Sequence, residues 1–219
     1  MINGNNFDMN KAGFTVNTEI DEVKNQGKRE EKFSRKKEIF EWLDVVSVAL
    51  IIVVLIFGFV FRVATISGDS MLNTLHNGEM VIIRNLFYKA EAGDIVVISR
   101  NIENSAETDV FGKGPIIKRI IATENQTVDI DFEKGIVSVD GKVLEEDYIS
   151  TPTTEKRDVE FPVTVPEGHV FVLGDNRLVS LDSRSSSIGT DGMVDERYIL
   201  GQAVFRVFPF KNIGRLDNK

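Results

Sequence analysis

The most uneven feature of the hydrophobic pattern is one long apolar run near the N-terminus. Residues Val45 to Phe61 read VVSVALIIVVLIFGFVF and carry no charged side chain. A membrane-spanning helix needs about 17–25 mostly apolar residues, whereas a surface helix of a soluble protein normally shows a polar face. Trp42 and Arg62 flank the run as candidate anchors at the membrane interface. The pattern therefore predicts a single transmembrane helix over residues 39–62.

A cleaved signal peptide is the other explanation for such a run. Leaders of that kind have a short charged start and an apolar stretch of about 7–15 residues. Here 44 residues precede the run, and the run is longer than the apolar stretch of a leader. The pattern favours a helix that stays in the membrane.

Basic residues are concentrated on the N-terminal side of the apolar run. On the other side, Arg62 is the only one before Arg84. Because short loops rich in lysine and arginine stay in the cytoplasm, we expect a cytoplasmic N-terminus and an extracytoplasmic remainder. Residues 1–38 are polar, which predicts a disordered basic tail. The basic cluster consists of Lys28, Arg29, Lys32, Arg35, Lys36 and Lys37.

Beyond Arg62 the apolar residues occur in short runs broken by turn residues, as is typical of β-strands. The expected strands are Met80–Arg84, Ile95–Ser99, Ile116–Ala122, Val170–Leu173 and Ala203–Val207. Within Val137–Val143, the Asp140-Gly141 pair favours a type I′ hairpin turn. We predict a mainly β fold, in which the single helix precedes a β-rich domain over residues 63–219. Residues 124–168 are expected to form a variable strand-and-loop insertion.

Composition narrows the chemistry that this domain can perform. The chain has no cysteine, two histidines and a net charge of −8. Thiol nucleophiles, disulfides and cysteine-based zinc sites are excluded. His76 and His169 lie in no recognisable motif, so we expect no metal and no cofactor. An acidic chain without a basic stripe is not expected to bind nucleic acid.

The first candidate for chemistry is the segment Ser67–Leu75, shortly after the apolar run. Gly68 permits a sharp turn, and Ser70 would sit at that turn beside backbone N–H groups of Gly68, Asp69 and Ser70. A nucleophile next to such donors is the arrangement needed for acyl transfer. The alternative is an ordinary Gly-Asp-Ser turn.

The second candidate is the strand Ile116–Ile121, which places a cation on each face. Lys118 shares one face with isoleucines, and Arg119 shares the other. A lysine removed from water can lose its proton near neutral pH, whereas arginine stays charged. Lys118 is therefore the better general base. In the alternative, both cationic groups extend to solvent.

The third candidate is the polar segment Gly174–Gly189, which directly follows an apolar strand. Its composition is typical of a solvent-exposed loop. Alternatively, an ion-pair network of Arg177, Asp182 and Arg184 would fix the loop. Ser180 or Ser183 would then be available to orient a lysine.

Together the three segments resemble those of the bacterial type I signal peptidases, and they occur in the same order. SGDSMLNTL is similar to the family's S-G-x-S-M-x-P-T-L motif, and KRIIA to its K-R-I-x-G motif. GDNRLVSLDSR fits its G-D-N-R-x-x-S-x-D-S-R motif without a mismatch. Gly93–Val97 and Val204–Pro209 also resemble family strands. With one predicted helix, the chain is most similar to the Gram-positive branch.

The resemblance implies a membrane-anchored serine endopeptidase that removes signal peptides from exported preproteins. Ser70 would be the nucleophile and Lys118 the general base. Ser180 would hydrogen-bond to the lysine amine, and substrate pockets would accept small residues near the cut. Expected supporting residues are Asp175, Asn176, Arg177, Asp182 and Arg184. Expected pocket residues are Ile66, Met80, Val81, Ile82 and Ile83.

Three positions depart from the family pattern. Asn73 stands where proline is usual, and Ala122 where glycine is usual. Gly68 stands where some members have a serine whose hydroxyl binds the oxyanion. The oxyanion hole is therefore expected to depend on backbone N–H groups, chiefly that of Ser70.

Two other functions remain open at this stage. One is a catalytically inactive relative that acts as a chaperone in surface-protein or pilus assembly, although such a protein need not keep both Ser70 and Lys118. The other is a self-cleaving repressor protease with a Ser/Lys dyad, which neither the predicted span nor the GDNR segment favours. The expected partners are preproteins, the lipid bilayer and, by proximity, the export translocon. The expected location is the cell membrane, with a single pass and an extracytoplasmic catalytic domain.

Overall fold

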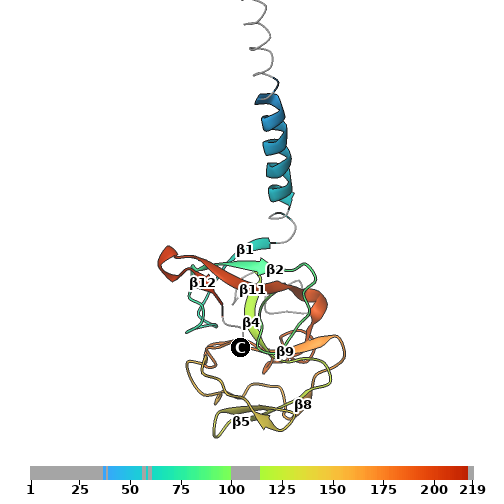
Figure 1. Cartoon of the computed structure of the whole chain (residues 1–219). Coiled ribbons are helices and arrows are strands. Elements are labelled where there is room, and N and C mark those ends of the chain that lie inside the picture. Colours follow the sequence, from blue (N-terminus) through green and yellow to red (C-terminus); the bar gives the residue numbers. More distant parts are fainter. Residues whose placement is uncertain (1–36, 38, 56–57, 59–60, 100–113, 217–219) are drawn as a thin grey trace, which may run out of the picture. The chain divides into compact units, whose positions relative to one another are not determined.

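The computed structural model of the chain describes residues 37, 39–55, 58, 61–99 and 114–216. Contacts divide the chain into two compact units, Met1–Leu55 and Ile56–Lys219. In the first unit, residues 39–55 form a helix (Figure 1). Its large apolar side chains lie exposed. Among the described residues, no helix has both the length and the apolar character required to cross a membrane. The predicted tail falls almost entirely outside the described residues.

The helix does not extend as far as the apolar pattern predicts. The strand β1 (Phe61–Thr65) begins at the last residue of the apolar run and pairs antiparallel with β2 (Met80–Arg84). The expectation of a helix through residue 62 is therefore wrong at its C-terminal end. The cause lies in the composition, because Phe61, Val63 and Thr65 favour a strand as readily as a helix when a partner strand is available.

The second unit is built on a large antiparallel sheet, which contains eight strands among the described residues. Its strand order is β1-β2-β11-β3-β4-β9-β10, and β12 pairs with β11. The remaining members are β3 (Ile95–Ile98), β4 (Ile116–Ala122), β9 (His169–Leu173), β10 (Val194–Asp195), β11 (Ile199–Phe208) and β12 (Gly214–Arg215). The sheet therefore places β4, which carries Lys118, between two partner strands.

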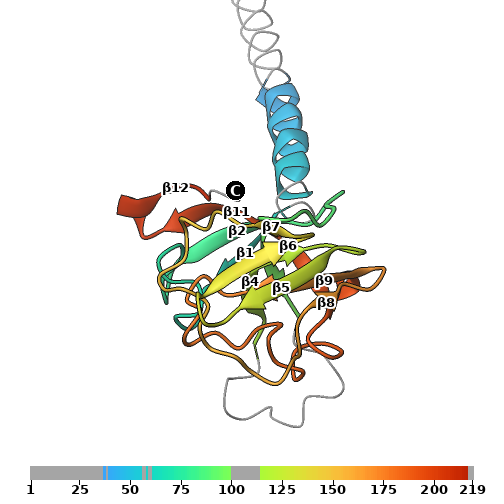
Figure 2. The same cartoon turned by 90° about the horizontal axis from the view of Figure 1, so that it is seen from below.

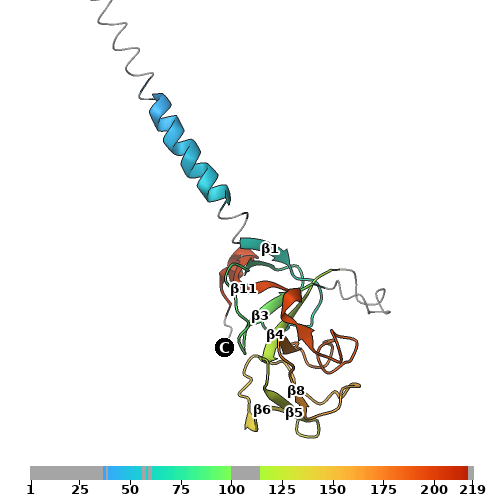
Figure 3. The same cartoon turned by 90° about the vertical axis from the view of Figure 1, so that its right-hand side faces the viewer.

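A smaller sheet forms one end of this unit: it lies at the bottom in Figure 3 and faces the viewer in Figure 2. Within the described part of the chain its order is β7-β6-β5-β8. Asp140 and Gly141 both have positive φ angles, 52° and 75°, which confirms the predicted type I′ turn. Two 3-10 helices, η1 (Glu196–Tyr198) and η2 (Phe210–Asn212), flank β11. The strands of the smaller sheet are β5 (Thr127–Asp131), β6 (Ile136–Val139), β7 (Lys142–Val143) and β8 (Val163–Thr164).

The strand β3 shows why the large sheet is buried on both faces. Ile95 and Val97 belong to one apolar cluster, whereas Val96 and Ile98 belong to another. Because successive side chains of a strand point to opposite faces, a core lies on each side of β3. This double burial explains the continuous apolar runs that predict β3 and β4 from the sequence.

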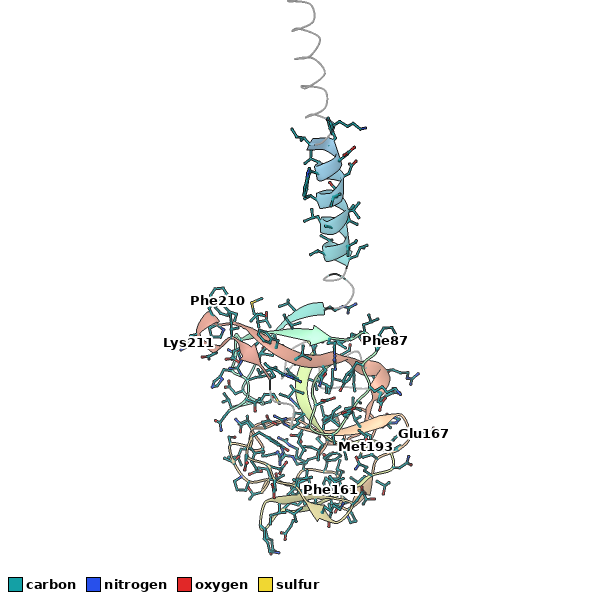
Figure 4. The ribbon with its side chains drawn as sticks, in the orientation of Figure 1. Phe87, Phe161, Glu167, Met193, Phe210 and Lys211 are labelled. Atoms are coloured by element: carbon teal, nitrogen blue, oxygen red, sulfur yellow. The ribbon has the colours of Figure 1, made fainter. Side chains whose placement is uncertain are left out.

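A third apolar cluster joins the smaller sheet to β4 and β9. Phe171 of β9 packs edge to face with Phe161, and their ring centroids are 5.9 Å apart. Figure 4 labels Phe161 beside the smaller sheet. Ala122, at the end of β4, is fully buried in this cluster. The second half of β4 therefore packs against residues of both sheets, which makes the strand a rigid support for its side chains.

Candidate active site

Ser70 lies at the end of a tight turn that follows β1. The turn is held to the chain beyond it, because the Gly78 N–H donates to the Ile66 carbonyl at 2.9 Å. Gly68 has a φ of +88°, a conformation that side chains with a Cβ rarely adopt. Its N–H donates to Asn77 Oδ1 at 3.1 Å. Glycine at position 68 is therefore required by the backbone of the turn.

The residues after Ser70 anchor the turn in the core. Met71 and Leu75 are buried in the same apolar cluster, and the Leu75 N–H donates to the Met71 carbonyl at 2.8 Å. In the described residues, the N–H of Ser70 has no hydrogen-bond partner, whereas that of Gly68 is occupied by Asn77. Of the three backbone donors expected for an oxyanion, Gly68 is therefore not available in this conformation.

Lys118 reaches Ser70 from the middle of β4. Its Nζ lies 3.0 Å from Ser70 Oγ and also donates to the Ile117 carbonyl at 3.0 Å. Lys118 is 3% exposed and Arg119 is 1% exposed. The alternative in which both cationic groups extend to solvent is therefore wrong, because the sheet is covered on both faces.

Arg119 supports the site from the opposite face of β4. Its guanidinium makes two hydrogen bonds to the Asp175 carboxylate, at 2.9 and 2.8 Å. Its Cζ lies 3.9 Å from the ring centroid of Tyr148, a cation–π contact. Burial raises the pKa of the Tyr148 phenol, so the ring stays neutral. The Thr74 hydroxyl donates to the same Asp175 carboxylate, which links β4 to the turn after Ser70.

Residues 174–186, here called the site loop, are fixed by buried ion pairs. Arg184 binds the Asp182 carboxylate through Nε at 2.8 Å and Nη2 at 3.0 Å, and both side chains are fully buried. Arg177 is also fully buried, but its ionic partner is Glu146 rather than a residue of the loop. The ion-pair network is confirmed for Asp182 and Arg184, and the solvent-loop alternative is wrong. Arg177 was expected to pair within the loop, and its actual partner comes from the insertion.

The site loop also touches the nucleophile turn directly. The Asn176 N–H donates to the Ser70 carbonyl at 2.9 Å, and Asn176 Nδ2 donates to the Asp69 carbonyl at 3.1 Å. Gly174, the first residue of the site loop, packs against both Ser180 and the turn. A Cβ at this position would lie 2.2 Å from Ser180 Oγ and 2.5 Å from the Ser70 carbonyl oxygen. The absence of a side chain at Gly174 therefore permits the close packing of Ser70 and Ser180.

Ser180 is buried next to the turn but does not make the expected hydrogen bond. Its Oγ is fully buried and has no hydrogen-bond partner in the described part of the chain. Ser183, the other candidate, has its hydroxyl engaged, because it accepts a hydrogen bond from the Val172 N–H at 2.9 Å. Ser180 is thus the serine whose hydroxyl is still available near the dyad.

A pocket of about 320 Å³ opens beside Ser70. Its wall differs from the one expected from the sequence, because Ile66, Val81 and Ile83 are buried in the core, and Met80 and Ile82 do not line it. The residues that form it are Ser67, Gly68, Asp69, Ser70, Ile116, Lys118, Val179 and Leu181. The pocket therefore combines the two candidate catalytic groups with an apolar side.

Four residues of the site were not anticipated from the sequence. Asn77 and Thr74 lie within the first motif or just after it, but nothing in their spacing predicts their partners. Glu146 and Tyr148 lie far from the motifs along the chain and reach Arg177 and Arg119 only through the fold. Glu146 lies in a polar segment with several other acidic residues, so nothing in the sequence indicates that this carboxylate is buried.

Comparison with known proteins gives a consistent result. The family described as Signal peptidase, peptidase S26, matches residues 39–208. The chain is 34% identical to Signal peptidase I of Bacillus licheniformis, over 86% of this chain and 99% of that protein. It is 32% identical to Signal peptidase IB of Staphylococcus aureus (strain COL), over 80% and 92% of the two chains. A solved signal peptidase I from Enterococcus faecalis V583 is 26% identical, covers 52% of this chain and 97% of that one, and has a TM-score of 0.38. The family match and the two relatives at 34% and 32% identity show that the chain belongs to the bacterial type I signal peptidases of the peptidase S26 family.

Proposed function

We propose that this protein removes signal peptides from exported preproteins, with Ser70 as the nucleophile and Lys118 as the general base. The observation that carries the proposal is the 3.0 Å separation between Lys118 Nζ and Ser70 Oγ at the edge of a pocket. Relatives named signal peptidase I align over most of this chain and support the substrate class. The distance lies within the range required of a nucleophile and its base.

Burial suits Lys118 to accept a proton. Removing an amine from water disfavours its charged form, and only 3% of Lys118 is exposed. Arg119 cannot take this role, because a guanidinium keeps its proton and this one is bound to Asp175. The two adjacent cations therefore have different roles: Lys118 acts as the base, and Arg119 holds the site loop.

The reaction would proceed through an acyl-enzyme. Lys118 takes the proton of Ser70 Oγ as the oxygen attacks the scissile carbonyl carbon, and it returns that proton to the leaving amine as the peptide bond breaks. Lys118 then takes a proton from water, whose oxygen attacks the ester carbon, and returns it to Ser70 as the ester breaks. The serine and the amine are regenerated, and the new carboxyl end leaves.

Backbone donors near Ser70 would stabilise the oxyanion of both steps. Asn77 occupies the Gly68 N–H, whereas those of Asp69 and Ser70 have no partner among the described residues. We expect the N–H of Ser70, the nucleophile itself, to be the chief donor. One such donor typically contributes about 3–4 kcal/mol to stabilisation of the transition state. The absence of a hydroxyl at position 68 makes this N–H more important to the rate.

The pocket supports a substrate with small apolar side chains near the cut. Ile116, Val179 and Leu181 form its apolar side, and Gly68 leaves room for a backbone to approach. We expect the end of the signal peptide to bind extended, with its scissile carbonyl between Ser70 and Lys118. The volume of about 320 Å³ is at the lower end of the range for small-ligand pockets.

The apolar run is proposed to anchor the enzyme in the cell membrane as a single-pass helix. Large apolar side chains such as Val46, Leu50 and Val54 are more than half exposed along residues 39–55, which suits contact with lipid. The basic residues before the run favour a cytoplasmic N-terminus. The catalytic unit would then lie outside the cytoplasm, where preproteins and the translocon meet it.

Product analysis tests the substrate class and separates the enzyme from an inactive chaperone. The full chain in detergent is incubated with an exported preprotein, and the products are identified by mass spectrometry. We expect one cut, directly after a small residue at the end of the signal peptide. A preprotein that binds but stays intact would favour the chaperone instead, and cuts scattered along the mature part would contradict the proposed specificity.

A further inference from the structure

A segment of the predicted insertion crosses over the site loop. Residues 145–160, here called the strap, contain no strand, yet they make contacts along the length of the loop. Glu146 binds Arg177 at one end, and the Glu155 carbonyl accepts a hydrogen bond from Arg184 at 3.0 Å. The strap therefore does more than connect β7 to β8, two strands of the smaller sheet.

One contact of the strap falls on Ser180. Arg157 Nη2 donates to the Ser180 carbonyl at 2.8 Å. Arg184 Nη2 also approaches that carbonyl, but at 3.5 Å, and its shorter contact is with the Arg177 carbonyl at 2.6 Å. A hydrogen bond from a charged donor is roughly twice as strong as a neutral one. Arg157 is therefore the main side-chain restraint on the backbone of Ser180.

That restraint bears on the dyad because Ser180 lies so close to Ser70. Ser180 Oγ and the Ser70 carbonyl oxygen both lie on the side of Gly174 where a Cβ would project, at 2.2 and 2.5 Å from that position. The Ser180 hydroxyl is buried, and it has no partner among the described residues. A shift of the Ser180 backbone would move this hydroxyl with respect to Ser70 and to Lys118, which contacts Ser70.

We propose that Arg157 is a positioning residue of the active site. Its guanidinium holds the Ser180 carbonyl and thereby keeps the Ser180 hydroxyl where it can orient the Lys118 amine. The inference rests on the proposed function and adds to it the role of Ser180 that the family resemblance implies. It assigns a role in catalysis to a residue that belongs to none of the sequence motifs.

The neighbouring Lys156 provides a matched control. Lys156 has the same charge, but its side chain is half exposed and binds Glu160, which is exposed as well. In the full chain, we expect Arg157→Ala to lower kcat by about tenfold and to leave KM little changed. A tenfold loss is roughly what the loss of one hydrogen bond from a charged group would cause in the rate. Lys156→Ala should match the wild type. An Arg157→Ala enzyme with wild-type kcat would overturn the inference.

The pH profile separates positioning from a loss of folded protein. A smaller folded fraction lowers kcat equally at every pH, whereas a displaced hydroxyl changes the environment of the amine and moves the acidic limb of the profile. We expect Arg157→Ala to shift that limb and Arg157→Lys, which keeps one charged donor, to restore part of kcat. An unshifted limb together with a lower Tm would assign Arg157 a purely structural role. If Arg157→Ala does not fold, Arg157→Lys alone is compared with wild type by the same two measurements.

A double-mutant cycle with Ser180 identifies the route of the effect. If Arg157 acts through Ser180, then Arg157→Ala should cause no further loss of kcat in a Ser180→Ala enzyme. Losses that multiply would refute that route. A Ser180→Ala enzyme as active as wild type would instead remove Ser180 from the proposed function. The dyad is then judged separately, by whether Ser70→Ala and Lys118→Ala are inactive.

Discussion

At the scale of single residues, the site depends on the different surroundings of two adjacent cations. Lys118 faces Ser70 and a pocket, whereas Arg119 faces a carboxylate and an aromatic ring. The two residues are consecutive in β4, and because successive side chains of a strand alternate, they point to opposite faces of the sheet. Lys118 can therefore gain and lose a proton while the neighbouring Arg119 keeps its charge.

The pH dependence of the reaction should follow the amine of Lys118. A protonated amine cannot accept the proton of Ser70, so kcat/KM should be low at acidic pH and rise as the amine loses its proton. Lys118→Arg should be inactive at every pH, because a guanidinium remains charged. The measurement is kcat/KM for a signal-peptide substrate across the pH range in which Tm stays constant. A rate independent of pH would contradict the role of Lys118.

Gly174 is a position where one added methyl group should lower both stability and activity. The Cβ of Gly174→Ala would collide with Ser180 Oγ and with the backbone of Ser70. Overpacking of this kind costs about 1–3 kcal/mol, and here it also displaces the nucleophile. We expect lower Tm and strongly reduced kcat. Gly214→Ala, where no atom lies within 4 Å of the new Cβ, should change neither; equal effects at both sites would count against the packing argument.

At the scale of elements, apolar runs predict most inner strands closely, but they find only Ala203–Val207 of the ten-residue inner strand β11. The strands β2 and β4 have the predicted bounds, because both are bordered by polar or turn residues. The strand β1 escapes prediction because its first residue, Phe61, is also the last residue of the apolar run. The strand β5, with the sequence TVDID, alternates too briefly to stand out.

In the candidate site too, residues within short motifs can be predicted from the sequence, whereas partners far along the chain cannot. Ser70, Lys118 and the Asp182–Arg184 pair are predictable, because each lies within a short motif. Glu146 is not, because its contact with Arg177 spans 31 residues and depends on how the strap folds back. Long-range partners of buried charges are set by the topology and not by local spacing.

The buried pair of the site loop should contribute strongly to stability. Asp182→Ala leaves the fully buried Arg184 guanidinium without its carboxylate. Loss of one partner from a buried pair costs about 3–5 kcal/mol, so we expect a large fall in the free energy of unfolding, measured with denaturant. Lys134→Ala breaks an exposed pair with Asp131 and should change it little. Similar losses from both variants would be inconsistent with the burial of the loop.

At the scale of the whole molecule, one unit carries the site and the other carries the proposed anchor. Lysine near the centre of a spanning helix costs about 2.5–3.5 kcal/mol per residue. We expect the double variant Leu50→Lys/Val54→Lys to lose flotation with lipid vesicles while it still cleaves a short peptide in detergent. Substitution of Lys37, outside the apolar run, provides the control. Undiminished flotation of the double variant would show that the run does not anchor the chain.

The central claim is that Ser70 and Lys118 together perform the hydrolysis. The most direct measurement is cleavage of an exported preprotein in detergent by the wild-type enzyme and by Ser70→Ala and Lys118→Ala, each with Tm verified. The account predicts that both variants fold and that each loses more than about a hundredfold in rate. A folded variant of either kind that cleaves at a rate close to wild type would contradict it.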